Sequence, residues 1–142
     1  MNSYELLLAS LGAAKQHPHT PVQIQKLIFL VEQNVADRLG GPYFAFKPYD
    51  YGPFDAQLYD YLREMERKGI VISTATSGGW KSYALTDTGL HEAERISTTI
   101  DPYSLDYIQR ASNFVRGLSF SDLVAAIYKA YPAMKENSVF RG

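Results

Sequence analysis

The sequence predicts a mostly helical α+β domain that contains one small β-hairpin. Apolar residues recur at three- and four-residue intervals over most of the chain, which is typical of amphipathic helices. One of these helical runs stops at Gly69, and a β-branched segment, Ile70-Val71-Ile72, follows it directly. The glycine turn Ser77-Gly78-Gly79 then leads into a second apolar run. A helix, a sharp stop and two strands around a turn predict a winged helix-turn-helix with additional C-terminal helices.

The length and composition indicate a globular chain. Its 142 residues fit one domain, which we divide into a winged-helix part (1–100) and a C-terminal helical pair with a tail (101–142). The formal net charge of -1 argues against a general polyanion binder. The chain has no cysteine, which excludes disulfides, thiol nucleophiles and thiolate zinc sites. It shows neither a signal-peptide pattern nor an apolar run of membrane-spanning length, so we expect a soluble cytoplasmic protein without a membrane partner.

Two helices are predicted before residue 40. The first runs from Tyr4 to about Gln16. The second has a strong start signal, because Thr20 is a natural N-cap, Pro21 suits the first helical position and Gln23 completes a capping box. Apolar residues surround most of this second helix, which predicts that it is central and covered on several sides.

The middle of the chain predicts a short strand and the helix that precedes the hairpin. Residues 43–47 alternate weakly and indicate an extended segment. Gly52 and Pro53 turn the chain, and Pro53 fits the first turn of a helix that ends at Gly69. Phe54 falls on the apolar stripe of this predicted helix and Tyr59 falls off it.

The remaining elements follow from turn and cap signals. The returning strand of the hairpin spans residues 80–85, and we expect Trp80 to cover the sheet against the core. Thr86 begins a helix to about Ser97. Two more helices follow, one after Asp101 and one capped by Ser119, and the residues from 133 onward are predicted to form a tail.

Several short motifs resemble the SocA-like Panacea antitoxin domain and a related group of uncharacterised prokaryotic proteins. The motifs are spread over most of the chain: Gln25-Lys26-Leu27-Ile28-Phe29-Leu30, Tyr51-Gly52-Pro53-Phe54, Leu62-x-x-Met65-x-x-x-Gly69-Ile70-Val71, Leu118-Ser119-Phe120, Ile127-Tyr128 and Tyr131-Pro132, with Lys135 and Ser138 close behind. Antitoxin members often carry a tryptophan before the Gly-Pro pair, where this chain has Tyr49-Asp50-Tyr51.

The resemblance implies a winged-helix-like fold with no known enzymatic activity, and we expect no cofactor. It also implies a role as an accessory or neutralising partner of another protein, such as a toxin encoded nearby. These implications are expectations for this chain.

An aromatic cluster supplies the candidate residues for binding a protein. Eight tyrosine and phenylalanine residues fall between positions 43 and 61. Tyrosine is enriched at protein interfaces because it offers a large, rigid and half-polar surface. The candidates for partner binding are Tyr49, Tyr51, Phe54 and Tyr59. Partly buried tyrosines at the edge of the core are the alternative interpretation.

A DNA-binding transcriptional regulator is the second functional hypothesis. It would use the 54–68 helix and the 78–81 wing, since the helix before the wing usually enters the major groove. The candidate contacts are Gln57, Arg63, Arg67, Lys68 and Lys81. Residues 42–95, however, contain six Lys/Arg and eight Asp/Glu, which does not favour phosphate binding. A homodimer could still concentrate the basic groups at two half-sites, so DNA binding is kept as an alternative.

Motifs of the familiar enzyme classes are absent from the sequence. It contains no nucleophile elbow, no His-Glu-x-x-His motif, no Walker loop and no Rossmann glycine pattern, so we expect no catalytic residues. His17 and His19 are two positions apart without an evident third ligand, so we expect a solvated loop and no metal site.

Overall fold

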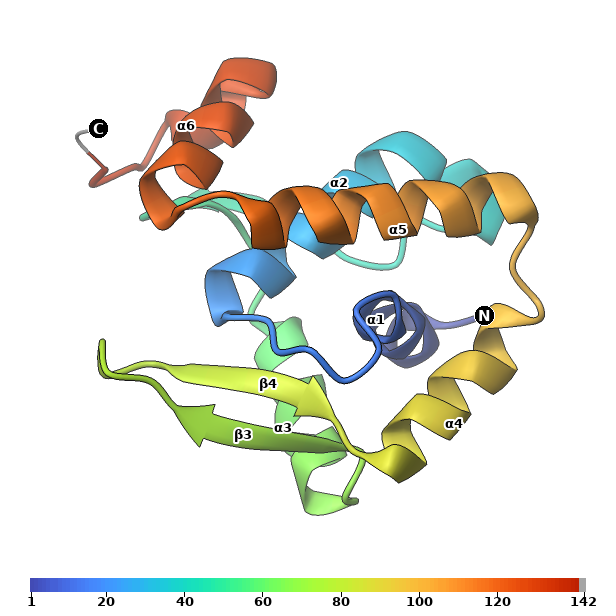
Figure 1. The fold of residues 1–142 in the computed structure, drawn as a ribbon. Coiled ribbons are helices and arrows are strands. Elements are labelled where there is room, and N and C mark those ends of the chain that lie inside the picture. The colour runs from blue at the N-terminus through green and yellow to red at the C-terminus, as the bar shows by residue number, and fades with distance from the viewer. Residues whose placement is uncertain (141–142) are drawn as a thin grey trace.

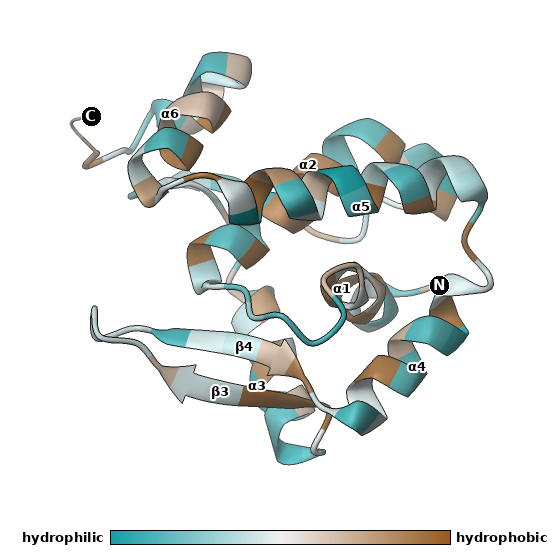
Figure 2. Cartoon of the chain, viewed as in Figure 1, coloured by the Kyte–Doolittle hydropathy of each residue, from teal (hydrophilic) through white to brown (hydrophobic). Residues whose placement is uncertain are grey.

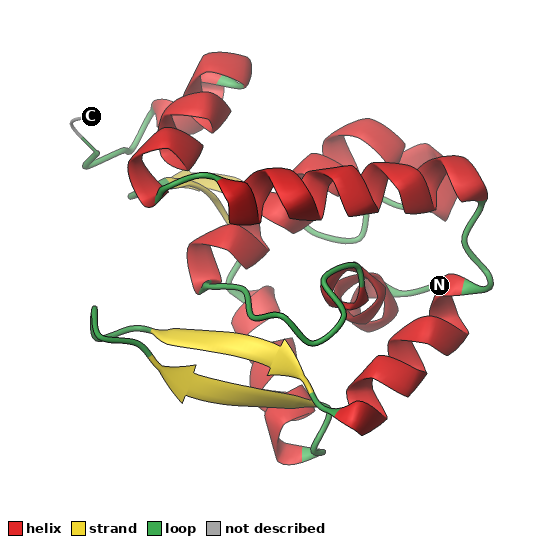
Figure 3. Cartoon of the chain, viewed as in Figure 1, coloured by secondary structure: helices red, strands yellow, loops and turns green. Residues whose placement is uncertain are grey.

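The computed structural model describes residues 1–140 as a mostly helical fold with two small antiparallel hairpins (Figures 1 and 3). The elements in chain order are α1 (Ser3–Gly12), α2 (Pro21–Leu39), β1 (Lys47–Tyr49), β2 (Gly52–Phe54), α3 (Gln57–Arg67), β3 (Val71–Ala75), β4 (Lys81–Leu85), α4 (Asp87–Ser97), α5 (Pro102–Gly117), α6 (Phe120–Ala130) and the short 3₁₀ helix η1 (Pro132–Lys135). The predicted α+β class is confirmed.

Helix α1 lies in the middle of the molecule (Figure 1). It packs closely on α4, while α2 and α5 form a second close pair on its other side. Figure 2 shows mostly apolar residues along α1 and alternating polar and apolar residues along α5. This distribution follows from burial, because a central helix is covered all round and an outer helix keeps a face in water.

The helix caps that the sequence predicts at Thr20, Thr86 and Ser119 are confirmed. Thr20 and Gln23 form the reciprocal capping box at the start of α2. Gly40 ends that helix in the left-handed conformation, with φ of 79°. The side chains of Thr86 and Ser119 accept backbone N–H bonds at the starts of α4 and α6. Local start and stop signals therefore determine these boundaries.

The prediction for residues 43–56 is wrong. The strand is Lys47–Tyr49 instead of 43–47, and it pairs with Gly52–Phe54, where the sequence predicted the first turn of a helix. A distant side chain explains the difference, because Gln25 on α2 holds the backbone of Asp55 in both directions, donating to its oxygen at 3.0 Å and accepting from its nitrogen at 2.9 Å. Phe54 therefore lies on a strand, and α3 begins only at Gln57.

Two ends of predicted elements also differ from the structure. Helix α1 stops at Gly12 instead of about Gln16, and a turn follows it. The predicted tail is only partly a tail, because η1 follows Tyr131 and Val139 donates its backbone N–H to the Asp50 oxygen at 3.0 Å. Positions 141–142 of that tail lie outside the described residues.

The larger hairpin, β3–β4, has five aligned residue pairs, from Val71 opposite Leu85 to Ala75 opposite Lys81. The segment before α2 adds an isolated bridge to it: His19 and Tyr83 exchange both backbone hydrogen bonds, at 2.9 and 2.8 Å. Within residues 1–140, no helix has both the length and the apolar character that a membrane crossing requires.

Candidate functional site

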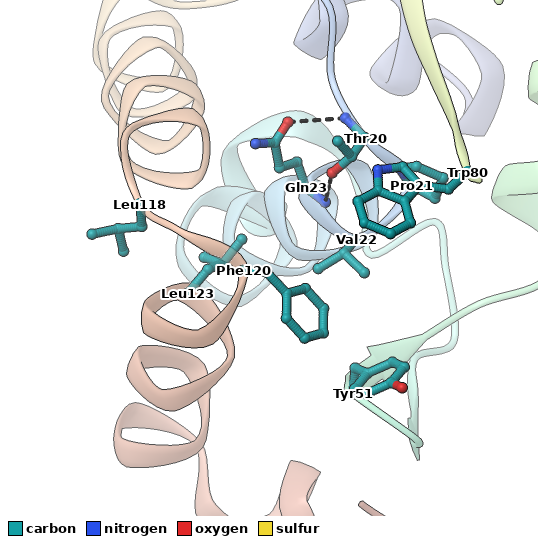
Figure 4. Close-up of a pocket in the computed structure, with 9 residues that line it drawn as sticks. All are labelled: Thr20, Pro21, Val22, Gln23, Tyr51, Trp80, Leu118, Phe120 and Leu123. Atoms are coloured by element: carbon teal, nitrogen blue, oxygen red, sulfur yellow. Dashed lines mark hydrogen bonds between the residues drawn. The ribbon is translucent and has the colours of Figure 1, made fainter. Parts of the chain in front are cut away.

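An apolar groove of about 490 Å³ lies where four parts of the fold meet (Figure 4). These parts are the start of α2, the β1–β2 turn, the tip of the β3–β4 hairpin and the junction of α5 with α6. The lining residues are Thr20, Pro21, Val22, Gln23, Tyr51, Trp80, Leu118, Phe120 and Leu123. None of them carries a formal charge. We call this cavity the aromatic groove.

Three large aromatic side chains of the groove are exposed to solvent. Trp80 is 55% exposed, Phe120 46% and Tyr51 42%. The rings of Tyr51 and Phe120 meet edge to face, with centroids 5.1 Å apart. Trp80 and Pro21 lie on the side of the groove opposite Leu118 and Leu123 (Figure 4). The aromatic groove is thus a water-accessible apolar concavity.

The expectation that Trp80 covers the sheet against the core is wrong. The turn before it explains why: the backbone N–H and the hydroxyl of Thr76 both donate to the Trp80 oxygen at 2.8 Å, which closes the turn and turns Trp80 outward. The indole ring lies over Gly78, where a Cβ atom would come within 2.2 Å of it. Only glycine at position 78 leaves room for the ring in this position.

The structure brings the four predicted partner-binding residues together. The ring of Phe54 lies 4.9 Å from that of Tyr49 and 5.7 Å from that of Tyr59, measured between centroids. All four line a second cavity of about 180 Å³, which shares Val22 and Tyr51 with the aromatic groove. Tyr49 and Tyr51 are exposed, whereas Phe54 and Tyr59 are half-buried. Burial raises the pKa of Tyr59, so its hydroxyl stays protonated.

A buried lysine on α2 forms a hydrogen bond with the backbone of the β1–β2 turn. Lys26 on α2 is 1% exposed, and its Nζ donates a hydrogen bond to the Tyr51 oxygen at 2.6 Å. Burial lowers its pKa to about 8, because the charged form loses hydration inside the protein. None of the ion pairs among residues 1–140 includes Lys26. Its ammonium is thus held by a carbonyl and not by a carboxylate.

The C-terminal segment holds the same turn from the other side. The Ser138 hydroxyl donates to the Asp50 oxygen at 3.1 Å and accepts from the Tyr128 hydroxyl at 2.6 Å. The Asn137 amide donates to the Pro48 oxygen at 3.3 Å. The turn that carries Tyr51 is therefore fixed by α2 and by a segment more than eighty positions away.

His19 is not in a solvated loop as predicted. It is 1% exposed, and its Nε2 lies 3.4 Å from the Ser112 hydroxyl. Among residues 1–140 its Nδ1 atom has no hydrogen-bond partner. Burial, with a smaller contribution from the Arg116 guanidinium, lowers its pKa to about 4. The backbone bridge to Tyr83 draws this residue into the core, so it is a neutral core histidine at pH 7.

The residues of the DNA-binding alternative are exposed on α3 and on the second hairpin. Arg63 pairs with Asp60, and Lys68 pairs with Glu64 at 3.6 Å. The remaining three residues of this set, Gln57, Arg67 and Lys81, are also exposed. Neighbouring carboxylates therefore neutralise part of the basic surface that the alternative requires.

Sequence reasoning missed Lys26 and Phe120 as site residues. Lys26 stands out in retrospect, because it is a charged residue in the mostly apolar run of residues 24–31. Phe120 had no such signal, since the first residue after an N-cap is often exposed and its place in the groove depends on the β1–β2 turn. The spacing of aromatic residues within the segment 43–61 could not predict that an aromatic residue of α6 joins them.

Within the described part of the chain, no cluster of three or more His, Asp or Glu residues is arranged to hold a metal ion. No protein-family model and no curated protein matches the chain. The interpretation of the site therefore depends on its geometry.

Proposed function

We propose that this chain is a non-enzymatic binding module of the winged-helix type that recognises another protein through the aromatic groove. The observation that carries the proposal is the exposure of Tyr51, Trp80 and Phe120 around one uncharged concavity. Exposed apolar surface costs free energy in water, and burial under a partner removes that cost. Tyrosine and tryptophan are also the residues that most often dominate the energy of protein interfaces.

The order of the elements supports the winged-helix assignment. Three helices, α1, α2 and α3, precede the β3–β4 hairpin, and α4 follows it. The extended residue between α1 and α2, His19, pairs with β4 as a short third strand would. The β1–β2 hairpin is then an insertion between the two helices of the helix-turn-helix, and this insertion carries Tyr49 and Tyr51.

The proposed role is that of an antitoxin-like or accessory neutralising partner, as the resemblance to the Panacea domain implies. The target is a protein, such as a toxin encoded next to this chain. The absence of charge in the groove fits a protein target better than a nucleic acid, whose phosphates require basic groups.

Co-expression with the protein encoded next to this chain tests the proposal. We expect the two to co-elute in size-exclusion chromatography, and the variant Trp80→Ser/Phe120→Ser to lose the complex. Ile72→Ser/Tyr103→Ser is the matched control, because Ile72 and Tyr103 are 58% and 57% exposed and lie outside the groove. Equal co-elution of both variants would contradict a role for the groove.

One observation favours the DNA-binding alternative. Lys81 is exposed beside the tip of the β3–β4 hairpin, the position at which a wing touches the DNA backbone, and no ion pair among residues 1–140 includes it. Salt-dependent retention on heparin, lost in Arg63→Ala/Lys81→Ala, would support this alternative. Absence of retention at low salt would remove it.

A further inference from the structure

The second cavity, beneath the β1–β2 hairpin, combines aromatic walls with a buried cation. Tyr49, Phe54 and Tyr59 form part of its walls, and Lys26 lines it from α2. Gly52 lies directly against the ammonium, since a Cβ atom at that position would be in ordinary van der Waals contact with Nζ, at 3.5 Å. The cavity adjoins the aromatic groove, since both are lined by Val22 and Tyr51.

The hydrogen bonding of Lys26 leaves capacity for a further acceptor. A lysine ammonium has three N–H donors. The structure assigns one of them, to the Tyr51 oxygen. Asp50 is the one carboxylate that lines this cavity, and it forms no ion pair with Lys26 among the described residues. A buried cation without a counter-ion is unfavourable, and an anionic group that enters the cavity would relieve this cost.

From this charge complementarity we infer that the second cavity accepts a carboxylate of the partner protein, from an Asp or Glu side chain whose large apolar neighbour fills the aromatic groove. The carboxylate oxygen would accept a hydrogen bond from Lys26 Nζ. The inference rests on the proposed function, and it adds the chemistry of the segment that binds: one acidic residue adjacent to one large apolar residue.

The charge state of Lys26 is compatible with this contact. Burial lowers its pKa to about 8, so the ammonium form still predominates at pH 7. A bound carboxylate stabilises that form further and makes a charge-assisted hydrogen bond, which is stronger than a bond between neutral groups. A neutral amide in the same place would offer a weaker acceptor.

A pair of small probes tests the inference on the intact chain. Phenylacetate and phenylacetamide share one aromatic ring and differ in charge. In titrations followed by NMR at the backbone amides of Tyr51 and Gly52 and at the Trp80 indole, we expect phenylacetate to bind at least about tenfold more tightly than phenylacetamide. The preference should disappear in Lys26→Met and in Lys26→Gln, and it should persist or increase in Asp50→Asn.

Each other outcome counts against the carboxylate site. Equal binding of the two probes to the wild type, or a preference that survives in both Lys26 variants, would overturn it. In either case shifts of the Trp80 indole by both probes would still show that the aromatic groove takes an apolar group, so the proposed function would stand. Binding of neither probe would contradict the carboxylate site and leave the co-elution experiment to decide the proposed function.

Discussion

The two hairpins of this molecule are held in place in different ways. The β3–β4 hairpin has five residue pairs and closes around its own turn, whose bonds join Thr76 and Trp80. The β1–β2 hairpin has three pairs, and its turn is held by contacts from elsewhere: Lys26 donates to the Tyr51 oxygen and Ser138 to the Asp50 oxygen. A three-residue hairpin is not stable alone in water, so the fold has to supply what the turn lacks.

The two hairpins contribute one aromatic side chain each to the groove, and these side chains are held in place differently. Tyr51 is placed by buried and long-range contacts, whereas Trp80 is placed by a turn that contacts mostly itself. We expect the Tyr51 side of the groove to be preformed and the Trp80 side to adjust when a partner binds. Variants at the attachment points and in the two turns test this difference.

His19 attaches β4 to the segment before α2, and its burial makes this attachment sensitive to acid. Its pKa is about 4 in the folded protein and 6.5 unperturbed, so the unfolded state binds the extra proton between these values and stability falls as pH falls. Relative to His19→Gln, the wild type should lose about 3 kcal/mol of unfolding free energy between pH 6.5 and pH 4. Urea unfolding at several pH values measures this loss, and parallel curves would contradict it.

Replacing Gly52 or Gly79 with alanine compares the two hairpin turns directly. Both have positive φ, 110° and 89°, and a Cβ has room at both: at Gly52 it would touch the Tyr128 ring at 3.4 Å, the near limit of ordinary contact, and at Gly79 it has nothing within 4 Å. We expect Gly52→Ala to cost about 2 kcal/mol of stability and Gly79→Ala about 1 kcal/mol, because a φ of 110° lies farther from the left-handed region than one of 89°. Thermal or urea unfolding of both variants is the measurement. A cost at Gly79 equal to or larger than that at Gly52 would contradict this order.

Lys26 should lower the stability of the protein while it supports the turn. With a folded pKa of about 8 and an unperturbed value of 10.5, the unfolded state binds the extra proton between those values, so stability rises with pH there. From pH 8 to 9.5 the wild type should gain about 2 kcal/mol relative to Lys26→Met. Urea unfolding of both proteins gives the difference, and a constant difference would mean that Lys26 is not desolvated.

Ser138 and Thr76 fix the turns of the two hairpins through hydroxyl groups. Ser138→Ala removes the bonds to the Asp50 oxygen and the Tyr128 hydroxyl and should cost about 1 kcal/mol. Thr76→Val removes one exposed bond to the Trp80 oxygen and should change stability by less than about 0.5 kcal/mol. A larger effect at Thr76 than at Ser138 would reverse the proposed order of attachment.

Local signals predicted most of the helices and the β3–β4 hairpin. Thr20, Thr86 and Ser119 act within a few residues of where they stand, so their roles as caps can be read from the sequence. The β1–β2 hairpin could not be predicted, because Gln25 and Lys26 determine it from a distant helix. Pro53, which commonly starts a helix, lies here on a strand for that reason.

The candidate site was predicted in part for the same reason. The four aromatics of one segment, Tyr49, Tyr51, Phe54 and Tyr59, do lie together. They are close in sequence, and the β1–β2 hairpin and the start of α3 keep them close in space. Phe120 and Trp80 join the groove from other parts of the chain, and only the packing of α6 and of the second hairpin brings them to Tyr51. Spacing along the sequence cannot predict contacts between residues so far apart in the chain.

Hydrogen–deuterium exchange with and without the co-eluting partner tests the central claim, that the groove is the binding surface. Binding should slow exchange together in three segments: the turn at residues 50–52, the hairpin tip at 76–80 and the α5–α6 junction at 118–123. Protection confined to the exposed face of α3, or to the outer face of α5 around Tyr103, would contradict it.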